Sequence, residues 1–410
     1  MDDLARFAGS LHEDLTAWRD ATTAPPLNKH ASQVAGIVGQ LTQAMTSLPT
    51  MTDAKSRLEL EQTVGDYTHI WDFFRTKFAL RYVPWYQPLL GAADDLAWVA
   101  FQPVRDLRAG RREPPLVYFS RDVIPFTVTR GQDYQNLLPR GGLWSDRSDE
   151  IASSLVVPVI SLPWQRFSSL SVLLSVAHEV GHVVVSDLGL LPVLSERLAG
   201  AGLTSQRHLL WSGWLEEVFA DIFSAVVCGG TVALALTDQL GTRPEPPATS
   251  AYPPAALRAR LITLTAGRRA DLSVQPGLDV GSADDQLGDL AADVAPVVTA
   301  LLDAELPPIP GRIEDLYPPV DGAELLDDID RLARGHDPQA GDIRVVLAAA
   351  ATVELTQPDA YHEQQAGPLA LKRAEAIRDV SRRRREDDTR ERDRQAGSDL
   401  ATMLQRSPRS

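Results

Sequence analysis

Two histidines and a glutamate in one short stretch of the chain could together bind and use a metal ion. The stretch reads His178-Glu179-Val180-Gly181-His182. In a helix, residues four apart lie on one face, so both imidazoles can reach a single zinc ion. Glu179 would project beside the metal, where its carboxylate can accept a proton from a zinc-bound water. The pattern also arises by chance, so its surroundings must support it.

A second, acidic segment offers a third metal ligand. It reads Glu216-Glu217-Val218-Phe219-Ala220-Asp221. Glu217 and Asp221 are also four residues apart, so they share one face of a helix. We expect Glu217 to bind the metal and Asp221 to accept the free ring N–H of a histidine ligand. Glu216 lies about 100° around the helix, which makes it the poorer ligand. Its alternative role is that of a solvent-facing or structural acid.

The elements that must position these residues are two strongly apolar stretches, residues 170–186 and 213–227, which we predict as buried helices. Burying two histidines and a glutamate without partners would cost several kcal/mol, so something must satisfy them. A histidine pair bonded to backbone carbonyls is the alternative to a metal site. Gly181 costs about 0.5–1 kcal/mol relative to alanine within a helix, which indicates close approach by another chain or by a substrate.

An HExxH helix followed by a helix bearing ExxxD, with Ala220 before the Asp, resembles the gluzincin metallopeptidases. This group includes the thermolysin-like and the intracellular HExGH…ExxAD zincins. The resemblance covers roughly residues 116–265 and implies a zincin-like catalytic unit, although the chain lacks the extended surroundings of the secreted enzymes. The resemblance implies that His178, His182 and Glu217 are the zinc ligands. It makes Glu179 the general base, and Asp221 the residue that supports a histidine ligand.

Three short apolar runs, residues 116–119, 125–129 and 155–162, predict the strands of a small sheet. Because Pro158 and Pro163 cannot donate to a ladder, the third strand should lie at a sheet edge. Gluzincins typically hold peptides in extended form against an edge strand before the active helix. The resemblance therefore makes residues 155–162 the expected peptide-binding edge, with a plain structural strand as the alternative.

A segment further along the chain, residues 252–258, is similar to segments of some bacterial intracellular zincins in which a His or Tyr and an Arg lie near the site. Tyr252 could donate a hydrogen bond to the tetrahedral oxyanion. Arg258 could bind a substrate carboxylate or pair with Glu216. The alternative is the start of a helix over 255–265 with an exposed Tyr and Arg.

Composition narrows the class of protein. The chain of 410 residues carries a net charge of −15, which argues against binding to nucleic acid or to an anionic membrane. Its one cysteine, Cys228, is expected to be a buried small hydrophobe. A single cysteine cannot form an intramolecular disulfide, and no signal-peptide pattern follows Met1. We therefore expect a cytoplasmic protein. The longest uncharged stretch, residues 222–237, is too short for a bilayer and predicts two buried helical pieces rather than a membrane span.

The chain divides by composition into four regions. We expect a helical region over 1–110, the metallopeptidase domain over 111–270, an acidic helical region over 271–370 and a charged tail over 371–410. The tail is expected to be a solvated helix or a frayed, disordered end, with a tail that docks a partner as the alternative. In the first region, six aromatic residues spaced by threes and fours should share one helical face in the core, with a ring-lined ligand groove as the alternative. They are Tyr67, Trp71, Phe74, Phe78, Tyr82 and Trp85.

The sequence thus predicts a mainly helical α+β fold: a zincin-like unit with a small sheet and two active-site helices, flanked by helical regions. The expected activity is zinc-dependent hydrolysis of peptide or protein substrates, by an endopeptidase rather than an exopeptidase. The alternatives are a catalytically inactive zincin fold that serves as a binding scaffold, and a helical interaction protein that binds no zinc.

Overall fold

The computed structural model describes residues 3–46, 54–105, 107, 112–130, 155, 157–240, 252–269, 287–307 and 309–378. These residues form a mainly helical fold with a small three-stranded mixed sheet, which confirms the expected α+β class. The charged tail beyond residue 378 and most of the loop before Tyr252 lie outside the described residues, so the predictions made for the tail stay predictions.

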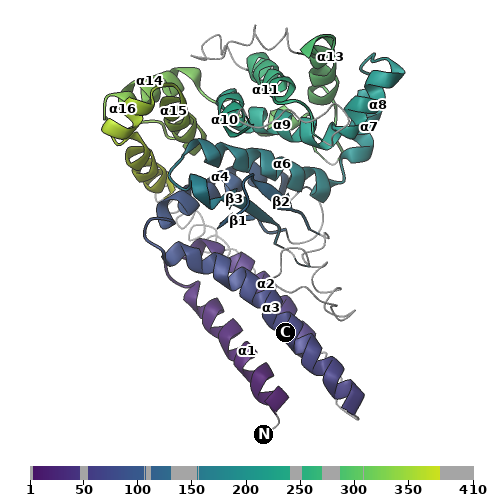
Figure 1. The fold of residues 1–410 in the computed structure, drawn as a ribbon, viewed down its shortest axis with the longest axis vertical. Coiled ribbons are helices and arrows are strands. Elements are labelled where there is room, and N and C mark those ends of the chain that lie inside the picture. The colour runs from purple at the N-terminus through teal and green to yellow at the C-terminus, as the bar shows by residue number, and fades with distance from the viewer. Residues whose placement is uncertain are drawn as a thin grey trace, which may run out of the picture.

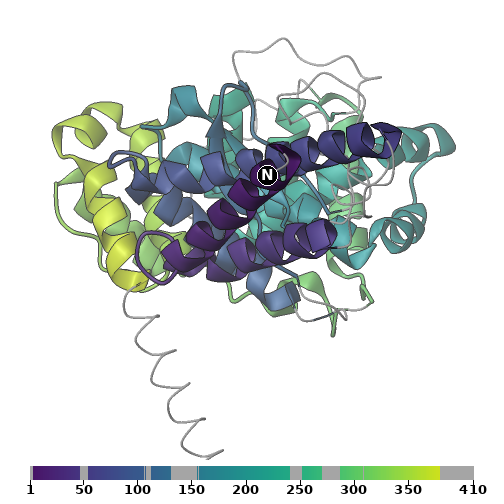
Figure 2. The same ribbon diagram turned by 90° about the horizontal axis from the view of Figure 1, so that it is seen from below.

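The sheet lies between two sets of helices, with a further helical layer above (Figure 1). Below it are α1 (Asp3–Ala21), α2 (Ala31–Thr46) and α3 (Ala54–Ala79), which cross the underside of the molecule in Figure 2. Directly above it are α4 (Gln87–Arg105) and α6 (Ser175–Leu188). The third layer, over α6, consists of α9 (Leu215–Cys228), α10 (Thr231–Leu240) and α11 (Ala255–Arg269).

The remaining helices flank this stack on two sides (Figure 1). On one side lie α7 (Leu191–Ala199), α8 (Ser205–Gly213) and α13 (Leu290–Leu302). On the other lie α14 (Gly322–Ala333), α15 (Ile343–Thr356), α16 (Pro358–Glu363) and a helix over residues 366–378. Short 3₁₀ helices occur at Asn28–His30, Leu80–Tyr82, Trp164–Arg166, Ser171–Leu174 and Ile313–Leu316.

The sheet contains β1 (Leu116–Ser120), β2 (Phe126–Val128) and β3 (Val159–Pro163). Its order is β1-β3-β2, with β3 parallel to β1 and antiparallel to β2. The prediction of an edge strand over 155–162 is therefore wrong, because this strand is central. Pro158 precedes β3 and accepts a hydrogen bond from Leu116 through its carbonyl, and Pro163 is the last residue of the strand. Neither proline interrupts the ladder, and within the described residues β2 is the edge strand beside α6.

Both faces of the sheet are covered, and alternate residues face opposite cores. Val117 and Phe119 of β1, with Ile160 of β3, belong to the upper core that contains α4, α6, α9 and the helices after residue 287. Tyr118 and Val159 belong to the lower core formed with α1, α2 and α3. Strands covered on both faces read as nearly continuous apolar runs, as these do in the sequence. The boundaries at residues 110, 270 and 370 stay predictions.

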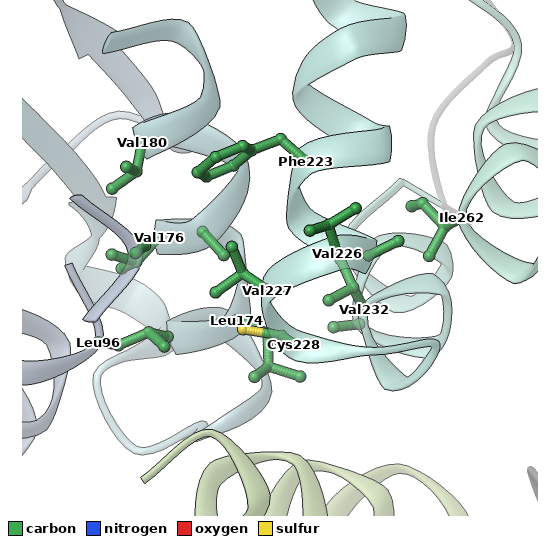
Figure 3. Close-up of a cluster of buried hydrophobic side chains, with 14 of the residues drawn as sticks. Leu96, Leu174, Val176, Val180, Phe223, Val226, Val227, Cys228, Val232 and Ile262 are labelled. Atoms are coloured by element: carbon green, nitrogen blue, oxygen red, sulfur yellow. The ribbon is translucent and has the colours of Figure 1, made fainter. Parts of the chain in front are cut away.

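The centre of the upper core lies between α6 and α9. Val176 and Val180 of α6 lie on the side of α9 that carries Phe223 and Val227, and Cys228 lies in the same cluster (Figure 3). Cys228 is buried, which confirms the expectation of a buried small hydrophobe, and burial raises the pKa of its thiol to about 12.

The apolar stretch over residues 222–237 forms two buried helical pieces, as predicted. α9 ends at Cys228, Gly229 adopts a φ of 75°, and α10 begins at Thr231. Among the described residues, one helical stretch, Ser171–Leu188, is long and apolar enough to cross a membrane, but 78% of it is buried inside this fold.

The aromatic stripe is a core feature over part of its length. Four of its rings are fully buried against the lower core: Tyr67, Trp71, Phe74 and Phe78. The prediction is wrong for Tyr82 and Trp85, which are 53% and 65% exposed. α3 ends at Ala79, Leu80–Tyr82 form a 3₁₀ helix and Val83 is extended, so neither ring keeps the phase of α3.

A buried ionic cluster joins the N-terminal helices to α4 and β1. Arg81 donates from Nη2 to Oδ1 of Asp94 at 2.7 Å and to the carbonyl of Val117 at 2.6 Å. Nζ of Lys29 lies 3.2 Å from Oδ2 of Asp94. Burial acts to raise the pKa of Asp94, but the charges of Arg81 and Lys29 hold it well below its usual range. The Asp94 carboxylate is therefore the anion at the centre of this joint.

Asp94→Asn should lower the free energy of unfolding by about 3–5 kcal/mol, because it leaves Arg81 buried without its counter-charge. Urea unfolding followed by circular dichroism measures the change. Asp95→Asn is the matched control: Asp95 also lies near Lys29, at 3.6 Å, but is more exposed, so we expect a loss below about 1 kcal/mol. Equal losses in the two variants would contradict the central role of Asp94.

Candidate metal and active site

α6 and α9 carry the proposed ligands and cross at very short range. A Cβ atom built on Gly181 of α6 would lie 2.9 Å from Cα of Ala220 on α9, closer than real Cβ atoms approach backbone. The close approach expected from Gly181 is therefore made by α9 of this same chain, rather than by another chain or a substrate. It brings the histidines of one helix against the carboxylates of the other.

Three potential ligands converge at this crossing. Nε2 of His178 and Nε2 of His182 are 3.2 Å apart. Oε2 of Glu217 lies 3.4 Å from Nε2 of His178, and Oε1 lies 3.5 Å from Nε2 of His182. Donor atoms of the three residues all lie within 4.8 Å of one another, which is close enough to surround one metal ion.

The outer nitrogen of each histidine faces a carboxylate. Nδ1 of His178 lies 3.0 Å from Oδ1 of Asp221, as expected, and Nδ1 of His182 lies 3.1 Å from Oε1 of Glu216. Each Nδ1–H can donate to its carboxylate, which leaves the two Nε2 lone pairs facing each other and Glu217. Three acceptors in this arrangement repel one another unless a proton or a metal cation lies between them, so the residues present fit a metal ion.

Glu216 is exposed, in keeping with its alternative role as a solvent-facing or structural acid, but its contact with His182 was not foreseen from the sequence. Its position on the helix excludes it as a good ligand but leaves it within reach of His182. The available signal was the adjacent pair Glu216-Glu217, since two neighbouring carboxylates can serve two histidines on the facing helix.

The electrostatics of the site also favour positive charge between the carboxylates. Burial acts to lower the pKa of His178, but hydrogen bonds to Asp221 and Glu217 raise it to about 10. Burial acts to raise the pKa of Glu217, but the hydrogen bond from His178 and the charges of His178 and Arg258 hold it below its usual value. Glu217 also lies in the first turn of α9, where the helix dipole stabilises a carboxylate.

Arg258 of α11 is buried and holds Asp221. Its Nε and Nη2 atoms each lie 2.8 Å from one oxygen of the Asp221 carboxylate, which is a bidentate pair. The predicted pairing with Glu216 is wrong, and so is the alternative of an exposed arginine at a helix start. α11 packs against the α9 face that carries Asp221, so the guanidinium meets that residue instead, with Oε2 of Glu217 at 3.5 Å.

Glu179 lies on the other side of the site, against the edge strand β2. Its side chain is buried, and Oε2 accepts a hydrogen bond from Oγ1 of Thr127 at 2.7 Å. Sequence reasoning did not single out Thr127. The alternation within residues 125–129 could have placed it on one face of a strand, but only the sheet order shows that this strand lies beside α6.

These residues line one cleft of about 480 Å³. Its lining also includes four apolar side chains: Ile124, Val232, Leu236 and Leu240. Tyr252 also lines the cleft and is half exposed. Partial burial and the charges of Glu217 and Glu179 raise the pKa of Tyr252, so its phenol keeps its proton at neutral pH and can donate a hydrogen bond.

Comparisons of the chain with protein-family models, with curated proteins and with solved structures find no match. The resemblance to gluzincins therefore rests on the motif residues and on the geometry described above. That geometry brings His178, His182, Glu217 and Asp221 together, with Glu179 in the same cleft.

Gly181→Ala should lower the free energy of unfolding by about 1–3 kcal/mol and weaken metal binding, because the new methyl group pushes α6 and α9 apart. Thermal unfolding and titration with Zn²⁺ measure the two effects. Gly65→Ala in α3 is the matched control. A Cβ there meets nothing within 4 Å, so the higher helix propensity of alanine should leave stability equal or raise it by about 0.5–1 kcal/mol. Full stability and metal affinity in Gly181→Ala would contradict the role of the crossing.

Proposed function

We propose that this chain is a zinc-dependent peptidase of the gluzincin type. The observation that supports it best is the convergence of His178, His182 and Glu217 in one cleft. The same cleft contains Glu179, whose carboxylate is hydrogen-bonded to Thr127. Two histidines and one glutamate are a ligand set of catalytic zinc sites, which leave a fourth position open. A structural zinc site would instead take four protein ligands.

The residues of the chain divide the work of hydrolysis between them. When bound, zinc polarises the scissile carbonyl and lowers the pKa of a coordinated water to about 7. Glu179 takes a proton from the attacking water and delivers it to the leaving amine as the C–N bond breaks. Tyr252 can donate a hydrogen bond to the developing oxyanion. Asp221 and Glu216 hold the two imidazoles in the tautomer that turns Nε2 toward the metal.

The edge strand for an extended substrate is β2 in this proposal, in place of β3. Phe126 and Thr127 of β2 line the cleft that contains Glu179. An extended peptide beside β2 would gain main-chain hydrogen bonds with little dependence on its sequence. The apolar residues of the lining would accept an apolar side chain of the substrate.

Cleavage of internal bonds is supported by the state of Arg258. It is the only arginine or lysine among the described residues that line the cleft, and Asp221 binds its guanidinium through two hydrogen bonds. A carboxypeptidase needs a free cation to bind the terminal carboxylate of its substrate. The described part of the cleft offers none, which argues against a carboxypeptidase, one of the two classes of exopeptidase.

A peptide with an acetylated N-terminus and an amidated C-terminus should be cleaved at a rate similar to that of the same peptide with free ends. Internally quenched fluorescent peptides measure both rates with the zinc-loaded protein. If only the peptide with free ends is cleaved, the protein is not an endopeptidase, and the proposal of a zinc peptidase stays in place.

Three substitutions should separate ligand, base and supporting residue. Glu179→Gln should retain zinc and lower kcat at least 10²-fold, because an amide cannot accept the proton. Glu217→Ala should lose zinc and, with it, thermal stability. Asp221→Asn should cost about 10–100-fold in zinc affinity or activity through a misoriented His178.

Zinc content, thermal unfolding and hydrolysis are measured side by side for these variants and for Glu216→Ala. Full zinc in Glu217→Ala, with zinc lost from Glu216→Ala, would show that the third ligand is wrong by one position. A wild-type chain that binds one zinc and hydrolyses no peptide would be an inactive scaffold. A chain that binds no zinc would be the helical interaction protein.

A further inference from the structure

The hydrogen bond between Thr127 and Glu179 joins the edge strand to the helix of the metal site. Thr127 is the middle residue of β2 and is paired with Ile160 of β3, whose side chain belongs to the upper core beneath α6. Residues paired across a ladder point to the same face, so Thr127 points toward α6. Oγ1 lies 2.7 Å from Oε2 of Glu179 and 3.2 Å from the Glu179 carbonyl. Its single proton goes to the shorter, charge-assisted bond.

A second attachment fixes the same strand to the far end of the same helix. Arg130, two residues after β2, donates to Oδ2 of Asp187 near the end of α6, and Nη1 of Arg112 lies 2.9 Å from Oδ1 of that carboxylate. Asp187 is eight residues beyond Glu179, or about 12 Å along the helix. Two attachments this far apart prevent β2 from sliding or pivoting against α6.

We propose that Thr127 is a positioning residue that fixes the general base relative to the strand that binds the substrate. This inference rests on the proposed function. With Oε2 bound by the Thr127 hydroxyl, Oε1 of Glu179 is the oxygen left to take the proton of the attacking water. The base and the main chain of β2 then move together, so a peptide paired with β2 brings its scissile bond to a base already in place. Misplacement of a catalytic group by about 1 Å can cost 10²-fold in rate.

The proton balance leaves Thr127 unchanged throughout. The water oxygen bonds to the carbonyl carbon, its proton moves to Oε1 of Glu179, and that proton passes to the amine nitrogen as the C–N bond breaks. Thr127 donates to Oε2 in each state. It lies outside the metal-ligand set, so its loss should affect the rate of the chemical step and not the binding of zinc.

The first test compares Thr127→Val, Thr127→Ser and wild type, each as the whole zinc-loaded chain. Valine is close in shape but cannot donate, so kcat should fall about 10- to 100-fold with KM and zinc content unchanged. Serine keeps the hydroxyl and should restore most of kcat. Thr68→Val in α3 is the control: it also removes a partly buried hydroxyl bond, to the Val64 carbonyl, and should leave kcat unchanged.

The second test needs no activity. Thermal unfolding of Thr127→Val, Glu179→Ala and the double variant forms a cycle, and a direct bond predicts that the two losses in Tm are not additive. Additive losses would overturn the proposal, and so would a wild-type kcat in Thr127→Val while wild type cleaves peptides. Non-additive losses with a wild-type kcat would make the bond purely structural. Failure of the zinc-loaded wild type to cleave any peptide would overturn this inference together with the proposed function.

Discussion

The crossing of α6 and α9 at Gly181 and Ala220 is the contact on which the proposed metal site depends. The three potential ligands come from two different helices, so the distance between the helix axes sets the size of the site. Only glycine permits the backbone approach seen here, since any Cβ at position 181 would meet Cα of Ala220 at 2.9 Å. The glycine weakens α6 by about 0.5–1 kcal/mol, and the apolar cluster around Val180 and Phe223 offsets that cost by pressing the helices together.

Charge in this apolar setting is tolerated because each group has a partner of opposite sign or a directed hydrogen bond. Arg258 orients Asp221, and Asp221 in turn faces Nδ1 of His178, so that Nε2 faces Glu217. On the far side, Thr127 orients Glu179. The polar groups form one row that passes from α11 through α9 and α6 to β2. Four carboxylates and a single arginine in this row leave an excess of negative charge, which a divalent cation reduces.

Local periodicity was enough to find the centre of the site but not its surroundings. His178 and His182, like Glu217 and Asp221, share a helical face because they are four residues apart, so the sequence contains this relation directly. The partner of Arg258 depends on which face of α9 meets α11, and the place of Thr127 depends on strand order; neither is a local property. The edge assignment of residues 155–162 failed because proline is excluded only where its missing N–H is needed, and Pro158 and Pro163 lie at the two ends of β3. The aromatic pattern failed at Tyr82 and Trp85 because periodicity does not show where α3 ends.

The N-terminal helices are part of the support of the site, although none of their residues lines the described cleft. The sheet connects these helices to the site, and the connection to Glu179 passes through β2. Thr127 faces upward and binds Glu179, while the next residue, Val128, faces downward into the core formed with α1, α2 and α3. A displacement of the lower core therefore acts on β2 directly and reaches the carboxylate of Glu179 through one hydrogen bond. The ionic cluster around Asp94 joins Lys29 and Arg81 to α4, on the upper side of the same sheet. The position of the N-terminal helices and the geometry of the cleft are thus set by one continuous framework, because adjacent residues of β2 face the two cores.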